Sequence, residues 1–290
     1  MVKVCLFTDH VFTLEIWMPE GHTVHRIARD HTKTFANQKM IVVSPQGRFE
    51  TEAKKISGRH LIGAEAFGKH LIYLWGTKSR EPTAKTKPAA IMHVHLGLYG
   101  KFRLHKNPPP EPRGAVRVRM IGYERAFDLN GPNTCELLSK VDFQTLKDRI
   151  GADPLRSDAD PERAWHKITK SRKAIGGLLL DQSVIAGIGN IYRAEILFKL
   201  GIHPEVKGNE LTREQFDAIW ALTVKLLKIG FKYNRIITVD RSDVDKPPSR
   251  LTRFERLLVY KKNRCPTCGN RVRQWEVAAR KMYACEKCQH

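Results

Sequence analysis

Short runs in which apolar and polar residues alternate fill most of the first half of the chain. The runs of strand length are Met40–Ser44, Ala66–Trp75, Ile91–His95, Lys101–His105 and Val116–Ile121. Alternation with a period of two is typical of strands that bury one face. Two Pro- and Lys-rich stretches, 76–90 and 106–114, read as long exposed loops between these strands. The pattern predicts an antiparallel β-sandwich.

Helical periodicity appears at two places. A helix is predicted to begin at Pro19, because apolar residues then recur on one helical face. The residues on this face are Val24, Ile27, Ala28, His31 and Phe35. From about Pro132 the pattern becomes helical. Within 178–204 one helix is predicted to end near Asp181 and a second to start after Asn190, with a glycine-rich turn between them.

These patterns predict an α+β, multidomain fold in which an N-terminal antiparallel β-sandwich with flanking helices precedes a helical domain and a small C-terminal module. A chain of 290 residues has room for two domains and such a module. The predicted divisions are residues 1–18 as an extension, 19–130 as the sandwich, 131–250 as the helical domain and 251–290 as the module. The last ten residues before the module, RSDVDKPPSR, have the composition of a linker.

The charge of the chain narrows the class of partner. Lys and Arg number 51 against 30 Asp and Glu, which gives a net charge of +21. Such an excess favours a polyanion, because basic side chains near phosphates release condensed counterions. Charge alone does not separate DNA, RNA and an acidic membrane surface. No stretch has the length and hydropathy of a membrane span or a secretory signal, so we expect a cytoplasmic protein that is not secreted.

Four cysteines near the end of the chain have the spacing of metal ligands. Cys265 and Cys268 form one Cys-x-x-Cys pair, and Cys285 and Cys288 form a second pair after sixteen intervening residues. Two such pairs predict a tetrahedral zinc site on a small hairpin. The alternative, two disulfides, requires an oxidising compartment. Four basic residues lie within or beside the predicted hairpin, as in a finger that binds nucleic acid: Arg271, Arg273, Arg280 and Lys281.

The glycine-rich turn within 178–204 is a candidate anion site. Gly187 and Gly189 precede Asn190, where the second helix is predicted to open. A glycine-rich turn at a helix start lets backbone amides reach a phosphate, and the Asn190 side chain adds a donor. The alternative is that Asn190 is an ordinary helix cap. The basic run Lys167–Lys173 nearby favours the phosphate site.

Six motifs together make the chain resemble the Fpg/Nei family of DNA glycosylases, the formamidopyrimidine and endonuclease VIII enzymes. In order, they are MPEGH, GKHLIYLW, HLGLYG, IGADPL, LLDQSVIAGIGNIYRAEILFKLGIHP and the four cysteines. The resemblance implies a bifunctional DNA glycosylase and AP lyase of base-excision repair with a helix–two-turn–helix domain. It implies damaged double-stranded DNA and abasic sites as partners, one structural Zn²⁺ and no redox or nucleotide cofactor. The enzyme is expected to be a monomer, and to be associated with the nucleoid if bacterial.

The resemblance also assigns catalytic roles. Pro19, made amino-terminal by removal of Met18, would attack the damaged nucleotide through its secondary amine, and Glu20 would act as general acid and base. Lys69 matches a strand lysine that holds phosphate and donates a proton, and Arg280 matches a finger arginine that grips phosphate. Without the resemblance, Pro19 is a helix-start proline and Lys69 a solvated strand lysine. The parity of Lys69 with apolar strand positions argues against the solvated alternative.

Three further residues match DNA-contacting positions of the family. His95 matches a position that contacts phosphate. Leu98 and Tyr99, on a loop bracketed by glycines, match the residues that fill the gap left by an everted base. The alternative for this loop is a hairpin turn with one side chain in the core.

The chain departs from the family pattern at three points. Seventeen residues precede Met18, and an amide at Pro19 has no basic lone pair, so we expect either a true start at Met18 or removal of the extension. Thr23 stands where many members carry Glu. An Arg-x-Phe wedge has no clear counterpart around Arg125–Phe127, which favours the endonuclease VIII side and oxidised pyrimidines as substrates.

Two rival functions remain at this level. A non-catalytic protein that binds damaged DNA is favoured if the extension before Pro19 is retained. An RNA-binding zinc protein of the translation machinery accounts for the charge and the cysteines, but it leaves three amino-terminal motifs unexplained.

Overall fold

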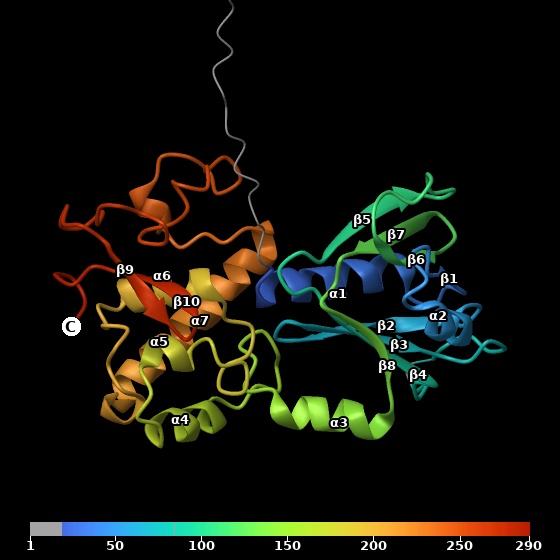
Figure 1. The fold of residues 1–290 in the computed structure, drawn as a ribbon, viewed down its shortest axis with the longest axis horizontal. Helices are drawn as coiled ribbons and strands as arrows, with labels where there is room; N and C mark the ends of the chain where they lie inside the picture. The colour runs from blue at the N-terminus through green and yellow to red at the C-terminus, as the bar shows by residue number, and fades with distance from the viewer. Residues whose placement is uncertain (1–18, 84) are drawn as a thin grey trace, which may run out of the picture.

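The computed structural model describes residues 19–83 and 85–290. The predicted extension, residues 1–18, lies outside the described residues. Figure 1 shows a sheet-rich amino-terminal half beside a helical half that ends in a small hairpin. The predicted α+β fold with a sandwich, a helical part and a cysteine-bearing hairpin is confirmed.

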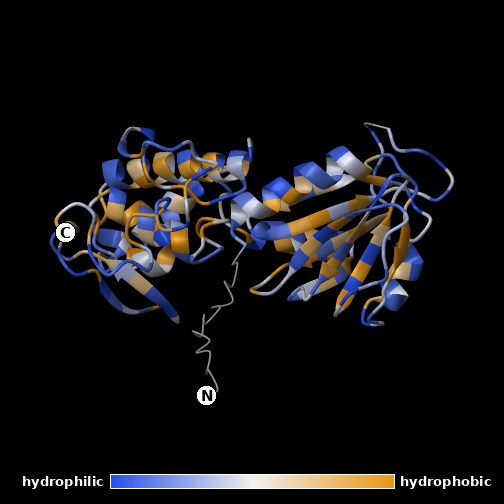
Figure 2. Cartoon of the chain, turned by 90° about the horizontal axis from the view of Figure 1, so that it is seen from above, coloured by the Kyte–Doolittle hydropathy of each residue, from blue (hydrophilic) through white to orange (hydrophobic). Residues whose placement is uncertain are grey.

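Two four-stranded antiparallel sheets form the sandwich. One sheet has the order β1 (Ile41–Val43), β6 (Val116–Ile121), β7 (Arg125–Asn130) and β5 (Lys101–Lys106). The other has the order β2 (Leu61–Phe67), β3 (His70–Trp75), β4 (Ala90–His95) and β8 (Thr134–Leu138). Alternate side chains of both sheets meet in one core with the helices α1 (Gly21–Phe35) and α2 (Glu50–Ile56), and Figure 2 shows apolar segments along these strands.

Two sequence predictions for the sandwich were wrong in detail. The run Ala66–Trp75 is two strands, because the chain reverses at Gly68 and Lys69. Gly68 has φ +58°, which a glycine adopts without strain, and the apolar alternation simply continues across the turn. The pattern also does not become helical at Pro132, since β8 follows it and pairs with β4.

The helical half contains α3 (Lys140–Arg149), α4 (Pro161–Thr169), α5 (Ile175–Leu178), α6 (Asn190–Lys199) and α7 (Arg213–Tyr233), with short 3-10 turns at Gly208–Glu210 and Arg241–Asp243. The terminal hairpin consists of β9 (Arg273–Val277) and β10 (Arg280–Ala284). Its buried side chains, including Val272 and Met282, belong to the same hydrophobic cluster as α6 and α7. The hairpin is therefore packed as part of the helical half. None of the described helices is long and apolar enough to cross a membrane.

The two halves are joined through α1. Arg26 donates from Nη1 to the carbonyl oxygens of Phe231 and Lys232 at the end of α7, at 3.0 and 2.8 Å. At the start of the same helix, the Gly21 amide donates to the Gly187 carbonyl at 2.8 Å. Because α1 also packs on β2 and β3, it fixes the sheets relative to the glycine-rich turn of the helical half.

Candidate active site

Glu20 lies at the junction of the two halves and is 1% exposed. Its carboxylate accepts hydrogen bonds from the backbone amides of Gly189, at 2.7 Å, and Ile191, at 3.0 Å. Both amides belong to the first turn of α6, where amide groups have no partner inside the helix. The carboxylate from one half is thus held by a helix N-terminus of the other half.

This contact explains why the turn before α6 is rich in glycine. A Cβ atom on Gly189 would overlap the carboxyl group of Glu20. Gly187 has φ +90°, a conformation that strains other residues, and packs directly against Gly21. The two glycines therefore serve the approach of Glu20, and the predicted anion at this turn is a carboxylate of the protein itself.

Burial raises the pKa of Glu20 above its usual value of 4.5, while Lys69 and the amides of α6 lower it in part. The net effect is to extend the protonated form of Glu20 to higher pH than an exposed glutamate allows. A carboxyl group with a raised pKa can give its proton to a leaving group.

Lys69 occupies the turn between β2 and β3 rather than a strand, which corrects the sequence assignment. The turn is anchored from the other half of the molecule, since the Gly68 amide donates to Asp153 Oδ2 at 2.6 Å. Asp153 also pairs with His25 Nε2 at 2.7 Å. Burial lowers the pKa of Lys69; Glu20 opposes this and Arg280 adds to it. Asp153 lies in the IGADPL motif but was not among the residues predicted for the site.

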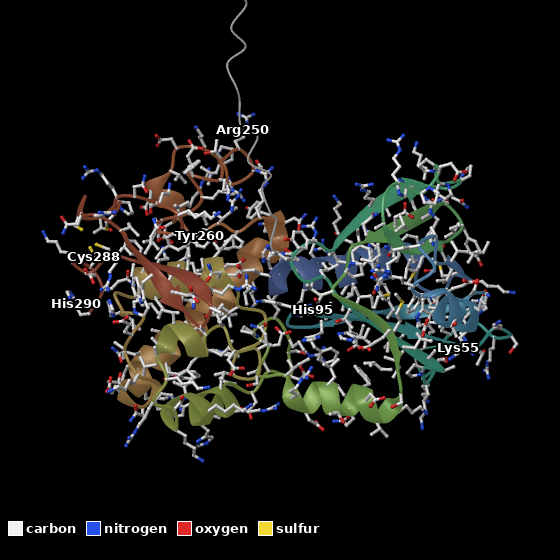
Figure 3. All side chains as sticks on the ribbon, in the orientation of Figure 1. Lys55, His95, Arg250, Tyr260, Cys288 and His290 are labelled. Carbon is white, nitrogen blue, oxygen red and sulfur yellow. The ribbon has the colours of Figure 1, made fainter. Side chains whose placement is uncertain are left out.

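A cleft of about 660 Å³ opens between the halves around these groups. It brings together most of the predicted site residues: Pro19, Glu20, Lys69, His95, Leu98, Asn190 and Arg280 all line it. Further lining residues include Lys173, Asp181 and Gln182 from the helical half. Figure 3 shows His95 near the junction of the halves, at the end of the sandwich that faces the helices. The cleft therefore combines a buried acid with several cationic side chains.

The loop that carries Leu98 and Tyr99 projects beside this cleft. Leu98 is half-buried and lines the cleft, whereas Tyr99 is 71% exposed. Gly97 has φ +63°, so the backbone turns there. Phe127, by contrast, is fully buried and stacks on His31 with ring centroids 4.4 Å apart. It has no access to the cleft, so Leu98 and Tyr99 remain the candidate wedge.

Arg193 organises the wall formed by α6 and the terminal hairpin, and the sequence analysis missed it. Its guanidinium donates to the carbonyl oxygens of Val277 at 3.1 Å and Arg280 at 3.3 Å, on both sides of the turn between β9 and β10. It also donates to Asn190 Oδ1 at 2.5 Å. Burial lowers the pKa of Arg193 to about 10. No local pattern marks this role, because α6 also carries Glu195 and Lys199.

Asn190 does not cap α6, because Gly189 holds the N-cap position. Its Nδ2 donates to the carbonyl oxygen of Lys281 at 3.0 Å, while its Oδ1 accepts from Arg193. Asn190 thus connects the start of α6 to the hairpin strand that carries Arg280. The contact places the side chain of Asn190 next to the hairpin along one edge of the cleft.

The four terminal cysteines converge on one point. Their Sγ atoms all lie within 4.8 Å of one another, and all four are free thiols. Two turns supply them, and each is closed by backbone hydrogen bonds, from Gly269 N to Cys265 O and from Cys288 N to Cys285 O, at 3.0 Å each. This cluster can hold a metal ion, and four thiolates in such an arrangement are the usual ligands of structural zinc.

A buried carboxylate connects this hairpin to α6. Glu195 is fully buried and accepts from the amides of Leu258, Val259 and Tyr260 at 2.7, 2.8 and 2.7 Å, and from the hydroxyl of Thr238. These amides belong to the segment that leads into the hairpin. The position of the hairpin therefore depends on α6 through both Arg193 and Glu195, which the sequence analysis did not select.

Fold and site together define a two-lobed protein with a basic cleft, a buried carboxyl group at the base of the cleft and a cysteine-bearing hairpin at its rim. The profile of the Formamidopyrimidine-DNA glycosylase N-terminal domain matches residues 18–130, and that of the Formamidopyrimidine-DNA glycosylase H2TH domain matches residues 150–242. The chain belongs to the formamidopyrimidine-DNA glycosylase and endonuclease VIII family of DNA glycosylases. The resemblance inferred from the motifs is confirmed.

Relatives from both branches of this family match nearly the whole chain. Endonuclease 8 1 of Mycobacterium tuberculosis is 43% identical over 280 residues, which cover 94% of this chain and 100% of that protein. The formamidopyrimidine-DNA glycosylase of Lactococcus lactis subsp. lactis is 30% identical over 288 residues, covering 94% and 99%.

Solved structures agree with this placement. A complex of the LlFpg protein with a THF-DNA and an inhibitor superposes with a TM-score of 0.74 at 26% identity, covering 94% of this chain and 100% of that one. MutM in complex with DNA containing carbocyclic 8-oxo-G gives 0.75 at 27% identity, covering 93% and 99%.

Proposed function

We propose that this protein is a bifunctional DNA glycosylase and AP lyase that removes oxidised bases from duplex DNA and acts as a monomer. The observation that carries the proposal is the buried carboxyl group of Glu20 beside Pro19, at the base of a cleft lined by Lys69 and Arg280. A neutral secondary amine, a proton donor and cations for phosphate are the groups that this chemistry requires.

The reaction begins at the nitrogen of an amino-terminal Pro19. An α-amino group has a pKa of about 8, so a useful fraction is neutral at pH 7. The nitrogen bonds to C1′ while the bond from C1′ to the base breaks, and the base departs with a proton from Glu20. Glu20 then takes the proton of the new ammonium nitrogen and gives it to the ring oxygen O4′, so that the C1′–O4′ bond breaks and an iminium forms at C1′ of the opened sugar. The iminium acidifies C2′. Loss of a C2′ proton breaks the C3′–O bond, which cuts the strand, and loss of a C4′ proton in a second elimination breaks the C5′–O bond.

A second cavity of about 310 Å³ adjoins the nucleophile and is suited to the everted base. Pro19 and Leu96 line both cavities. The second is bordered by α1 on one side, with Thr23 and Asp30, and by Phe102 of β5 on the other. An aromatic side chain opposite polar groups fits a flat heterocycle that carries hydrogen-bonding edges.

We propose oxidised pyrimidines as the preferred substrates. The wedge residues Leu98 and Tyr99 lie on one loop, and Phe127 is sequestered in the core. The higher identity to an endonuclease 8, 43% against 30% for a formamidopyrimidine-DNA glycosylase, supports the same side of the family. Excision rates on a thymine glycol duplex and an 8-oxoguanine duplex test this preference, and faster excision of 8-oxoguanine contradicts it.

The active form is proposed to begin at Pro19. Within a longer chain the nitrogen of this proline is a tertiary amide and cannot form an imine. The family profile begins at residue 18, and 94% of this chain spans the whole of the mycobacterial relative. Both observations support processing or initiation at Met18.

We further propose that the four cysteines hold one structural Zn²⁺. Bound to these thiolates, zinc would hold the two turns of the hairpin together and supply no reacting group. The zinc would also stabilise contacts at the other end of the hairpin. There the carbonyl oxygens of Lys281 and Arg280 accept hydrogen bonds from Asn190 and Arg193, and these bonds require that β9 and β10 remain paired.

Borohydride trapping on an abasic-site duplex tests the function. Reduction converts a prolyl imine into a stable covalent complex. We expect a chain started at Met18 to trap, and the same chain with Pro19→Gly, whose primary amine still forms an imine, to trap more slowly. The full chain is expected not to trap unless it is processed, which mass spectrometry of its amino terminus reveals.

Failure of the Met18 chain to trap would contradict the lyase mechanism and favour a protein that only binds damaged DNA. If an unprocessed full chain traps, another amine performs the attack, and a Lys69→Met variant identifies whether Lys69 is that amine. His166→Ala, at an exposed position of α4 outside the residues that line the cleft, serves as the control and should trap like the parent chain.

A further inference from the structure

Three histidines and a glutamate form a chain of contacts on the outer face of the sheet that carries the cleft loop. His70 lies on β3, His93 and His95 on β4, and Glu136 on β8. The register places His70 opposite His95 and His93 opposite Glu136, so all four side chains share one face. Of the four residues, only His95 lines the cleft.

The hydrogen bonds of this group have a fixed direction. Glu136 Oε1 lies 2.9 Å from His93 Nδ1, and His93 Nε2 lies 2.9 Å from His70 Nδ1. A carboxylate only accepts, so the proton of a neutral His93 ring is on Nδ1, and its Nε2 is an acceptor. His70 must therefore donate from Nδ1. The carboxylate thus sets the tautomer of two successive rings.

His95 is the end of the group that reaches the cleft. Its ring lies against that of His70, with centroids 5.0 Å apart and planes inclined by 50°. Its Nδ1 is buried and has no hydrogen-bond partner among the described residues. A proton on this buried Nδ1 would lack an acceptor, whereas a proton on Nε2 can be donated to water or to a phosphate. The tautomer of His95 protonated at Nε2 is therefore the one that can donate a hydrogen bond into the cleft.

Burial and the surrounding charges favour the neutral form of the three histidines. Burial lowers the pKa of His70 to about 3 and that of His95 to about 4, and Lys69 at the β2–β3 turn adds to both effects. Arg149 at the end of α3 also lowers the pKa values of His70 and His93. Glu136 alone acts in the opposite direction, on His93.

We propose that His70, His93 and Glu136 form a relay of fixed tautomers that positions His95 as a neutral Nε2–H donor to a DNA phosphate in the cleft. His70, His93 and Glu136 are positioning residues, since they act through His95. The inference rests on the proposed function to the extent that the cleft binds DNA. Trapping by Pro19 is a separate observation, so a failure of the relay and a failure of the enzyme mechanism are distinguishable.

A double-mutant cycle on the chain started at Met18 tests the coupling. Loss of one hydrogen bond to a phosphate weakens binding by about tenfold. With a duplex that contains a tetrahydrofuran abasic analogue, we expect His70→Leu and His95→Ala each to raise Kd by about that factor. The double variant should be no weaker than either single variant. Additive losses would overturn the proposal, because a merely structural role of His70 would not depend on His95.

Conservative variants separate tautomer control from packing. In His70→Asn the side-chain amide can still donate to His93, and in Glu136→Gln the amide oxygen can still accept from it. Both are expected to bind within twofold of the parent, whereas Glu136→Leu, at a half-exposed site, should follow His70→Leu. His105→Gln removes a histidine that pairs with a carboxylate elsewhere in the sandwich and is the matched control.

Two further measurements test the relay without the His70 and Glu136 variants. Nitrogen-15 spectra of the unmodified protein should show His93 protonated at Nδ1, the tautomer less common for a free ring. Between pH 5.5 and 8 the parent and His95→Ala should show the same pH dependence of binding, because a cationic His95 would tighten binding by the parent alone as the pH falls. A His93 protonated at Nε2, or binding that strengthens in acid through His95, would refute the relay.

Discussion

At the scale of single residues, the site is built from ionisable groups that burial forces away from their usual behaviour. Glu20 holds its proton more tightly and Lys69 holds its proton less tightly than in water. In each case loss of solvent is the largest cause, and it favours the neutral form of both groups. Glu20 and Lys69 can therefore lie together at the bottom of the cleft, because burial makes each of them easier to keep in its neutral form.

Replacement of Glu20 by Gln is expected to slow base excision by about 10²–10⁴-fold, the usual contribution of a positioned general acid. Glu20 is active as an acid while protonated, so the rate should fall as the pH rises through its raised pKa, and the variant should lack this decline. Single-turnover excision from a damaged duplex between pH 5 and 9 measures both effects. An unchanged rate in Glu20→Gln would exclude the acid role.

The same pKa shift predicts a change of stability with pH. The folded state binds the Glu20 proton more tightly than the unfolded chain does, so this contribution is complete below about pH 4.5 and is lost as the pH rises through the folded pKa. The free energy of unfolding of the parent should therefore decline relative to that of Glu20→Gln from pH 5 to 8. Urea unfolding of the two proteins at each pH checks the sign.

Arg193→Ala should lower the free energy of unfolding by about 1–3 kcal/mol, because it leaves buried carbonyl oxygens without donors. It should also weaken binding to an abasic duplex, since the turn before Arg280 and the Asn190 side chain both lose their anchor. Urea unfolding and fluorescence anisotropy measure the two effects. Lys228→Ala, at an exposed position of α7, is the control and should change neither quantity.

At the scale of elements, a few turns decide where the chemistry lies. The turn before α6 presents amides to Glu20, the turn between β2 and β3 presents Lys69, and the turn between β9 and β10 precedes Arg280. Each is held from outside its own element, by α1, by Asp153 and by Arg193 respectively. The elements are scaffolds, and the tertiary contacts between their ends form the site.

Removal of zinc is expected to affect more than the hairpin. Because the hairpin shares its hydrophobic cluster with α6 and α7, Cys268→Ser should lower the melting temperature of the helical half as well as abolish strand cleavage. Elemental analysis should find one zinc per chain in the parent and less in the variant. Cys135→Ser, outside the cysteine cluster, controls for loss of a thiol; equal zinc content in all three proteins would contradict the assignment.

At the scale of the whole molecule, two lobes with separate cores face each other across a basic cleft. Helix α1 and Asp153 connect the lobes, so the positions of Glu20 and Lys69 depend on the placement of the helical half. The net charge of +21 belongs to the whole chain, acts over a longer range and favours a polyanion as partner. We expect position within the cleft, rather than charge, to distinguish the residues that bind the substrate from the other basic residues.

Salt dependence tests this distinction. Lys173 lines the cleft, whereas Lys55 lies on the far side of the sandwich from His95 (Figure 3). Lys173→Gln should reduce the slope of log K against log salt by about 0.9, the value for one lost phosphate contact on duplex DNA. Lys55→Gln should leave the slope for a short abasic duplex unchanged. If log K depends on log salt with the same slope in both variants, the duplex does not contact Lys173 in the cleft.

The sequence by itself determined the features that depend on short stretches of chain. The two Cys-x-x-Cys pairs, the amphipathic helix after Pro19 and the alternating strands are local patterns, and their structures follow from ligand spacing and side-chain periodicity. Neighbouring residues suffice for such features. The motifs also identified the family, and with it most of the residues that line the cleft.

Tertiary structure alone decided which groups meet. Glu20 lies 169 residues from the Gly189 amide that holds it, and 128 residues separate His25 from Asp153. Arg193 and Glu195 read as ordinary helical charges until packing buries them against the hairpin and its leading segment, and the complete burial of Phe127 within the sandwich is likewise a result of packing. Burial and pKa depend on what other segments bring to a residue, and a pattern along the chain does not contain that information.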